Sequence, residues 1–282
     1  MFSLVHRFIF FPYLCYRNQA IHSAMMKKYI LDLVVRRTSA PRPGYVLLQL
    51  TDSSTPLPPM QPGQFVEVRV DGSPATFLRR PISINLVDYN ANELWLLIHV
   101  VGAGTRALAE LKAGDTVNLV LPLGNGFTLS PTPHSPLLIG GGVGTAPLLY
   151  LGQELKRQGT QPTFLLGART REDLLQMELF REAGEVFITT EDGSLGERGF
   201  VTQHSLWNGT SAYDYIYTCG PKPMMVAVAR LAREKGIPCE ASLENLMACG
   251  LGACLCCVED TTEGHVCVCK EGPVFNIEKL KW

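Results

Sequence analysis

The chain has 282 residues, of which 46% are hydrophobic, and its formal net charge is −1. This length predicts about two domains and a small module, and the low net charge removes the electrostatic case for a nucleic-acid partner. No apolar run approaches the roughly 18 residues that a membrane-spanning helix needs. Six of the nine cysteines fall between Cys249 and Cys269 without an evenly spaced disulfide framework, which predicts a reducing, cytoplasmic location.

Residues 1–25 are expected to be a disordered N-terminal extension or to reflect a misplaced translation start. The apolar stretch Phe8–Cys15 follows a basic residue, as in a signal peptide, but Pro12 interrupts it and no small-residue cleavage site follows cleanly. The first predicted strand opens at Lys27–Ile30, so the folded part of the chain is expected to begin near residue 26.

Residues 26–130 are predicted to form an antiparallel β-barrel. Short apolar or alternating segments are separated by turns rich in proline and glycine, such as Pro41–Gly44, and strands at this spacing indicate a small barrel or sandwich. A brief helix is expected at Arg106–Leu111, ending before Gly114. The predicted strands are Tyr29–Val35, Tyr45–Leu50, Gln64–Val70, Leu94–Val100 and Thr116–Leu121.

A basic, proline-containing segment, Leu78–Ile84, lies inside this domain. A flavin dinucleotide needs a charge for its pyrophosphate, a flat apolar wall for its ring and a polar group near its reactive nitrogen. The arginine pair, Pro81 and Ser83 offer these groups, and Gly102–Thr105 adds backbone N–H groups at the start of the short helix for a second phosphate contact. An arginine pair before a proline turn is also typical of a solvated strand end, so both interpretations are open from these residues alone.

Residues 131–241 change to alternating strands and helices, which predicts a nucleotide-binding parallel α/β sheet. Gly140–Pro147 is a glycine-rich turn before a predicted helix at Leu148–Gln158. It departs from the G-x-G-x-x-G fingerprint by ending in Ala-Pro, so a turn that serves only packing is an alternative. The predicted strands are Leu137–Ile139, Thr163–Leu166, Val186–Thr189 and Tyr215–Thr218.

The segment Cys219–Met225 follows the last of these strands and begins a helix. Ligands of open α/β sheets lie beyond the carboxyl ends of the strands, so the thiol of Cys219 could pack against a nicotinamide ring. A buried structural cysteine is as common at such a place.

Residues 242–282 carry the cysteine-rich segment. Cys249, Cys254 and Cys257 are spaced C-x4-C-x2-C, which is the plant-type [2Fe-2S] spacing once a distant fourth cysteine is added. The adjacent Cys256 competes for the third ligand position, and the spacing selects Cys257.

Two glycines inside this segment, Gly250 and Gly252, permit the positive φ values and close approach that a loop around a cluster requires. For the fourth ligand, Cys267 and Cys269 are both available. A zinc site usually takes two C-x2-C pairs, whereas Cys254 and Cys257 form the single natural pair here, so an iron-sulfur cluster is favoured over zinc or inert thiols.

The order of these features resembles the ferredoxin-NADP reductase superfamily: Arg80–Ser83 in a barrel, then Gly140–Pro147 and Cys219–Met225 in a sheet. The tail narrows the resemblance. Glu244–Cys254 and Cys269–Phe275 look like the family of electron-transfer subunits of dihydroorotate dehydrogenase B. The similarity covers the chain from about residue 27 to its end.

The resemblance implies a residue set for each cofactor. For the [2Fe-2S] cluster it implies Cys249, Cys254, Cys257 and Cys269, so it favours Cys269 over Cys267. Ile82 stands where the wider superfamily has an aromatic residue over the flavin, as in the narrower family. The implied FAD-binding residues are Arg80, Pro81, Ile82, Ser83, Leu97, Ile98, His99, Gly104 and Thr105.

The resemblance also implies a function without a catalytic side chain. Electrons would pass from the FMN of a catalytic partner subunit through the [2Fe-2S] cluster and FAD to NAD⁺ in pyrimidine (UMP) synthesis, in a complex with two copies of each subunit. His99 is expected to be a flavin neighbour and no acid–base group, because the cofactor supplies the chemistry. NAD is expected from the family alone, since Gly167–Asp173 contains both arginines and acids that could select either nucleotide.

Two other functions are compatible with the residues. One is a flavin/iron-sulfur reductase subunit of another complex, of the hydrogenase or ferredoxin:NADP type, from which only the tail motif separates this chain. The other is a metal-stabilised interaction module without flavin. Iron, labile sulfide and FAD in the purified protein would exclude that module, whereas zinc without iron would favour it.

Overall fold

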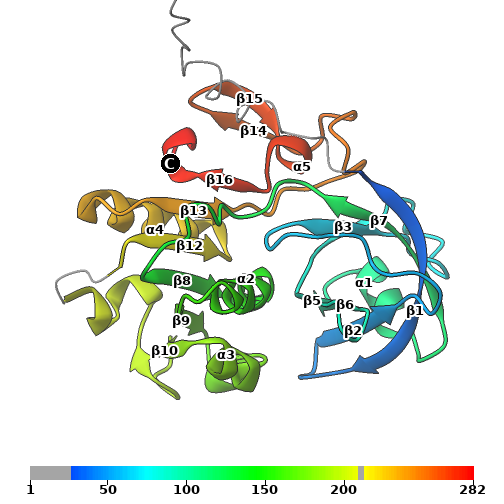
Figure 1. The fold of residues 1–282 in the computed structure, drawn as a ribbon, viewed down its shortest axis with the longest axis horizontal. Helices are drawn as coiled ribbons and strands as arrows, with labels where there is room; N and C mark the ends of the chain where they lie inside the picture. Colours follow the sequence, from blue (N-terminus) through cyan, green and yellow to red (C-terminus); the bar gives the residue numbers. More distant parts are fainter. Residues whose placement is uncertain (1–26, 209–212) are drawn as a thin grey trace, which may run out of the picture.

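The computed structural model describes residues 27–208 and 213–282. The predicted N-terminal extension, 1–25, lies outside the described residues. Figure 1 shows three parts: a curved sheet, an α/β sheet, and a C-terminal module that contacts both. None of the described helices is long and apolar enough to cross a membrane.

The first part is an antiparallel sheet with strand order β4-β3-β7-β1-β2-β6-β5. Side chains along each strand alternate between the two faces of the sheet, and those on one face form a core. This core includes Val66 and Val68 of β3 and Leu119 and Leu121 of β7. The edge strands β4 and β5 do not pair with each other, so the sheet is a partly open barrel. The elements are β1 (Tyr29–Ser39), β2 (Tyr45–Thr51), β3 (Phe65–Val68), β4 (Arg80–Ser83), β5 (Leu86–Asp88), β6 (Glu93–His99), α1 (Ala103–Ala109) and β7 (Thr116–Leu123).

The second part is a sheet with strand order β11-β10-β9-β8-β12-β13-β16, parallel throughout except for β16. Leu138 packs with α2 and α3 on one face, while Leu137 and Ile139 pack with α4 on the other. The strands are β8 (Pro136–Gly141), β9 (Thr163–Ala168), β10 (Glu185–Thr190), β11 (Glu197–Arg198), β12 (Tyr215–Cys219) and β13 (Cys239–Ser242). The helices are α2 (Ala146–Arg157), α3 (Met177–Ala183) and α4 (Lys222–Lys235), with 3-10 turns at η2 (Gly142–Thr145), η3 (Arg171–Asp173), η4 (Val201–Gln203) and η5 (Ser205–Asn208).

The third part begins after β13 and returns to the same sheet. A hairpin of β14 (Val258–Thr261) and β15 (Gly264–Cys267) is followed by the short α5 (Val268–Glu271), β16 (Val274–Asn276) and η6 (Ile277–Lys279). Strand β16 pairs antiparallel with β13 at the sheet edge, next to β13 in Figure 1. The end of the chain is therefore built into the α/β sheet.

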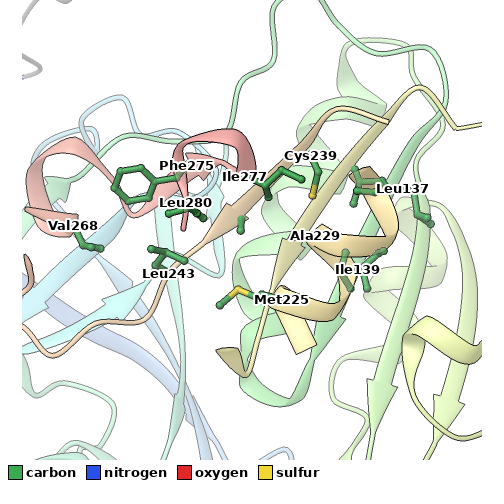
Figure 2. Packing of buried hydrophobic residues seen from close by; sticks show 14 of the residues in the cluster. Leu137, Ile139, Met225, Ala229, Cys239, Leu243, Val268, Phe275, Ile277 and Leu280 are labelled. Atoms are coloured by element: carbon green, nitrogen blue, oxygen red, sulfur yellow. The ribbon is translucent and has the colours of Figure 1, made fainter. Parts of the chain in front are cut away.

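A shared apolar core joins this module to the sheet. Figure 2 shows Leu243, Val268 and Phe275 of the module together with Met225 and Ala229 of α4. Cys257 and Cys269 belong to the same buried cluster. Burial of each large apolar side chain contributes roughly 1.5–3 kcal/mol of free energy, so this core holds the cysteine segment against the sheet.

Polar contacts fix the barrel against the sheet. The fully buried Asn85 donates from Nδ2 to the carbonyl of Ala146 (2.9 Å) and accepts at Oδ1 from Nε2 of Gln176 (2.9 Å). The hydroxyl of Tyr150 donates to the carbonyl of Met60 at 2.9 Å. Buried polar groups without such partners would cost about 1–3 kcal/mol each, so these contacts favour one relative placement of the barrel and the sheet.

The structure confirms the predicted order of parts and differs in several elements. Helix α2 begins at Ala146 and not at Leu148, because Pro147 is compatible with the first helical turn. The glycine turn therefore ends earlier, in the 3-10 turn η2. Strands β4 and β5 and helix α3 were not predicted, since each is too short for its periodicity to stand out.

One carboxyl lies buried where the barrel meets the cysteine segment. Glu67 on β3 is 1% exposed, and neither carboxylate oxygen has a hydrogen-bond partner among the described residues. A Cβ atom at Gly250 would lie 2.7 Å from its Cγ, so the segment rests on this side chain. Burial raises the pKa of Glu67 to about 7, against the lowering effect of the nearby Arg80 and Arg79.

This pKa predicts how stability depends on pH. In the native state the carboxyl of Glu67 keeps its proton up to about pH 7, whereas in the unfolded state it loses the proton near pH 4.5. The free energy of unfolding therefore falls as the pH rises from 4.5 to about 7. Glu67→Gln carries no titrating proton at this position, so above this pH window its free energy of unfolding should exceed that of the wild type by about 3 kcal/mol.

Denaturant unfolding at both ends of the window measures the effect. Glu234→Gln, on the exposed side of α4, is the control and should leave the pH profile unchanged. If the free energies of unfolding of Glu67→Gln and wild type differed by the same amount at both ends of this pH range, the raised pKa of Glu67 would be contradicted.

Candidate functional site

A cavity of about 490 Å³ lies at the carboxyl ends of the parallel strands; we call it the sheet cavity. Gly141 ends β8, Ala168 ends β9 and Thr189 is near the end of β10. The connection from β12 to α4 adds Pro221 and Met224, and Tyr45 reaches it from the barrel. This is the place at which open α/β sheets bind nucleotides.

The two glycine motifs of the sheet meet beside this cavity. A Cβ at Gly144 would lie 2.4 Å from the Cα of Gly220, and one at Gly141 would lie 2.7 Å from the sulfur of Met224. The backbones thus approach to a distance that no side chain allows. Thr189 lines the cavity with a buried hydroxyl that has no partner among the described residues. A polar ligand such as a nucleotide fits this site, because it could satisfy that hydroxyl.

Cys219 is 1% exposed and packs inside the sheet. Burial raises its pKa well above the ordinary value for a thiol. Of the two interpretations given to this residue, its surroundings match a buried structural cysteine.

A second cavity of about 400 Å³, the arginine cavity, is formed by the barrel. Arg80 at the start of β4 lines it together with Gly104 and Thr105 of α1. A Cβ at Gly104 would lie 3.1 Å from Cδ of Arg80, so the missing side chain lets the arginine cross the start of the helix. The hydroxyl of Thr105 accepts hydrogen bonds from the N–H groups of Val101 and Gly102, both at 3.0 Å, which closes the turn.

The charge of Arg80 is available to a ligand. No described carboxylate forms an ion pair with it, whereas the neighbouring Arg79 donates to Oδ1 of Asn118 at 2.5 Å. No acidic residue lines the arginine cavity. A free guanidinium beside backbone N–H groups fits a pyrophosphate.

The remaining predicted flavin residues lie outside the arginine cavity. Pro81, Ile82 and Ser83 continue β4 in a half-buried position. Leu97 and Ile98 are buried in β6, and His99 is exposed, with its ring stacked on Tyr45 at 4.6 Å between centroids. Strands β4 and β6 contact each other, so the three predicted segments lie on one side of the barrel.

The cysteine segment turns backbone N–H groups towards sulfur atoms. The N–H of Leu251 lies 3.3 Å from the sulfur of Cys249, and that of Gly252 lies 3.0 Å from the sulfur of Cys269. The N–H of Cys269 in turn lies 3.4 Å from the sulfur of Cys257. Positive φ values at Gly250, Gly252 and Leu255 make these turns possible.

These contacts favour thiolates at some positions. Burial would raise the pKa of Cys249, but N–H groups of Leu251, Cys254 and Ala253 outweigh it and lower this pKa to about 6. Burial and the neighbouring Cys257 raise the pKa of Cys269 to about 12 in the same structure. A positive metal centre stabilises the thiolate form and offsets such a cost.

The two candidates for the fourth ligand differ in their surroundings. Cys269 is buried and lies beside Cys257, whereas Cys267 is half-buried with its sulfur 3.9 Å from the carbonyl of Gly252. Cys254 and Cys256 are both exposed. In the described chain no three His, Cys, Asp or Glu side chains gather closely enough to hold a single metal ion. The backbone N–H groups directed at three of the cysteine sulfurs fit a cluster held by four thiolates.

Several residues of these sites were not predicted from the sequence. Tyr45 and Thr189 line the sheet cavity, and Glu67 lies beneath the cysteine segment. Glu67 alternates with Val66 and Val68, as a charged residue on the outer face of a barrel strand would, so its burial leaves no local signal.

Comparison with known proteins matches two parts of the chain to known domains. Residues 244–281 match the iron-sulfur cluster binding domain of dihydroorotate dehydrogenase B, and residues 138–230 match an oxidoreductase NAD-binding domain. Among solved structures, one of an NADH-dependent reduced ferredoxin-NADP oxidoreductase superposes with a TM-score of 0.79 at 29% identity, covering 89% of this chain and 90% of that one. Phthalate dioxygenase reductase shares the fold, with a TM-score of 0.63 at 18% identity.

Relatives of known function cover most of the chain. The dihydroorotate dehydrogenase B (NAD(+)) electron transfer subunit of Shouchella clausii is 38% identical over 266 residues, which are 91% of this chain and 99% of that protein. The subunit of the same name from Desulforamulus reducens is 43% identical over 231 residues, covering 78% of this chain and 87% of that one. The chain belongs to the family of electron transfer subunits of NAD-dependent dihydroorotate dehydrogenase B.

Proposed function

We propose that this chain carries electrons from the FMN of a dihydroorotate-oxidising catalytic subunit to NAD⁺, in pyrimidine synthesis in the cytoplasm. The observation that carries the proposal is the position of β3, which pairs with the Arg80 strand and also supports the cysteine segment through Glu67 and Gly250. One strand thus borders the sites proposed for both redox cofactors. When bound, a [2Fe-2S] cluster supplies one-electron transfer, and FAD exchanges single electrons for the hydride that NAD⁺ accepts.

The proposed domains follow the sites: residues 26–130 hold FAD, 131–241 hold NAD and 242–282 hold the cluster. In the first, Arg80 neutralises the pyrophosphate, and Gly104 and Thr105 present the start of α1 to it. The other proposed FAD contacts are Pro81, Ile82, Ser83, Leu97, Ile98 and His99, along the neighbouring strands. No side chain of this chain is assigned an acid–base role.

We assign the cluster to Cys249, Cys254, Cys257 and Cys269. Support comes from the N–H groups directed at three of these sulfurs, which stabilise negative charge on them. The exposed position of Cys254 would leave one side of the cluster near the surface. Electrons from a partner protein could enter there without crossing the core.

The surface that we propose for the partner protein lies around the exposed Cys254. Leu246, Leu251, Leu255 and Val258 are large apolar side chains exposed on the cysteine segment and the following strand. Exposed apolar residues gathered in one region are typical of protein–protein interfaces. We propose that the catalytic subunit binds here, with two copies of each chain in the complex.

A second candidate is a flavin/iron-sulfur reductase of the ferredoxin:NADP type, favoured by the similarity to the solved oxidoreductase. Nucleotide preference separates the two. Glu191 and Arg169 both line the sheet cavity, one suited to a ribose 2′-hydroxyl and the other to a 2′-phosphate. We propose NAD, and a strong preference of the assembled complex for NADP would favour the second candidate.

Replacing single cysteines should separate ligands from bystanders. Cys249→Ser, Cys254→Ser, Cys257→Ser and Cys269→Ser should each lose the cluster, because a hydroxyl is a poor substitute for a soft thiolate donor. Cys256→Ser and Cys267→Ser are the matched controls and should keep it. Iron and labile sulfide content, with the EPR signal of the reduced protein, report the outcome. A full signal in Cys269→Ser, and its loss in Cys267→Ser, would move the fourth ligand.

Removing the guanidinium of Arg80 should release FAD while the fold stays intact. A charge-assisted hydrogen bond contributes about 1.5–3 kcal/mol, so Arg80→Ala should weaken FAD binding about tenfold to a hundredfold. Equilibrium dialysis followed by flavin fluorescence measures this. Arg69→Ala, which removes an exposed arginine paired with Asp71, is the control. Equal FAD content in both variants would argue against this placement.

Assembly should be required for the complete reaction. The isolated chain should reduce a dye with NADH but should not oxidise dihydroorotate, and adding the catalytic subunit should restore that activity. Leu255→Asp should prevent restoration and co-purification, because it places a charge in the proposed interface. Aspartate tolerates the positive φ at this position, so the loop should keep its shape.

The exposed Ile30 on β1 provides the control, since Ile30→Asp adds the same charge outside the proposed surface. This variant should assemble like wild type. Oxidation of dihydroorotate by the isolated chain would refute the two-subunit function, whereas normal assembly of Leu255→Asp would refute only the proposed surface.

A further inference from the structure

An aromatic side chain of the arginine cavity has no role in the function proposed so far. Phe77 lies on the connection between β3 and β4 and is 93% exposed. It lines the cavity together with Leu78, which is 49% exposed, and Val101, which is 70% exposed and lies on the connection between β6 and α1. Single exposed apolar residues are ordinary, but here three of them border one cavity.

The connection that carries Phe77 is held in place. The N–H of Thr76 donates to the carbonyl of Ser73 at 2.9 Å, and the hydroxyls of these two residues lie 2.8 Å apart. The methyl group of Thr76 would lie 3.0 Å from a Cβ at Gly104, so this turn packs against the start of α1. Phe77 therefore directly follows a turn that is fixed by these contacts, and its side chain is exposed at the cavity.

The lining residues of the arginine cavity differ in burial and in chemistry. The half-buried Arg80 lies against the buried Gly104, where the guanidinium and the backbone suit a phosphate. Phe77, Leu78 and Val101 supply apolar surface, and no carboxylate is present. Such a site fits a ligand that joins a phosphate to a flat, uncharged ring. Its volume of about 400 Å³ lies within the usual range for small-molecule sites.

Only one half of FAD can use this rim. Hydride transfer to NAD⁺ requires the isoalloxazine to lie towards the sheet cavity, which shares no lining residue with the arginine cavity. Pro81–Ser83 run from Arg80 along β4 outside the arginine cavity. With the pyrophosphate on Arg80, the flavin half would follow these residues, and the adenine half would remain on the side of Phe77.

We propose that Phe77 stacks on the adenine ring of FAD, with Val101 on the opposite wall, and thereby makes the chain select FAD over FMN. This inference rests on the proposed FAD site. FMN lacks the adenosine half, so it gains nothing from the aromatic ring. Stacking of a base on an aromatic side chain contributes about 1–3 kcal/mol.

Binding of the two flavins to the flavin-free full-length chain tests the inference. Phe77→Ala should raise the dissociation constant for FAD about tenfold and leave that for FMN unchanged. Phe77→Tyr keeps a stacking ring and should bind FAD like wild type. The control is Ile30→Ala, which removes a similarly exposed apolar side chain on β1 and should change neither constant.

Each outcome is decisive. Unchanged FAD affinity in Phe77→Ala would overturn the inference, as would an equal loss for FAD and FMN, which would place the ring against the flavin half. In both cases binding of FAD by the wild type would leave the proposed function standing. A wild-type chain that binds no FAD would overturn the proposed function together with the inference.

Discussion

The pairing of β16 with β13 is the constraint on which the arrangement of sites depends. It returns the end of the chain to the α/β sheet, so the cysteine segment is anchored at both ends. Cys257 and Cys269 then share an apolar core with α4, while Gly250 rests on Glu67 of the barrel. Protein interiors are close-packed, so the segment has little freedom to shift relative to either part. The cluster site is thereby positioned against both nucleotide-binding parts at once.

Close approach at glycine is the common device of the three sites. Gly144 lies against Gly220 in the sheet, Gly104 against Arg80 in the barrel, and Gly250 against Glu67 at the cysteine segment. A Cβ at Gly144 would lie 2.4 Å from the backbone of Gly220, so even alanine would force these elements apart, whereas at Gly104 and Gly250 the neighbouring side chains would have to shift. Replacing any of these glycines would thus disturb a site without removing a side chain that binds a ligand.

The two proposed redox sites beside the barrel differ in the charges that they stabilise. Arg79 is held by Asn118, which leaves Arg80 free for an anion on the cavity side. On the cysteine side, backbone N–H groups stabilise negative sulfur, and the pKa of Cys249 is lowered to about 6 by Leu251 and its neighbours against the effect of burial. The buried Glu67 lies between them with its pKa raised by burial. A proton on this carboxyl lowers the cost of burying it beside thiolates.

The sequence alone determined the order of parts and the kind of chemistry, because both depend on local spacing. Alternation predicted the barrel strands, the change to strand–helix units predicted the sheet, and C-x4-C-x2-C predicted the cluster. Only the tertiary structure decided which distant residues share a site. It brought Tyr45 of the barrel to the sheet cavity, buried Glu67 under Gly250 and joined Val101 to Phe77 in the arginine cavity. Such contacts join residues far apart in the chain, and no local period or motif encodes which surfaces pack together.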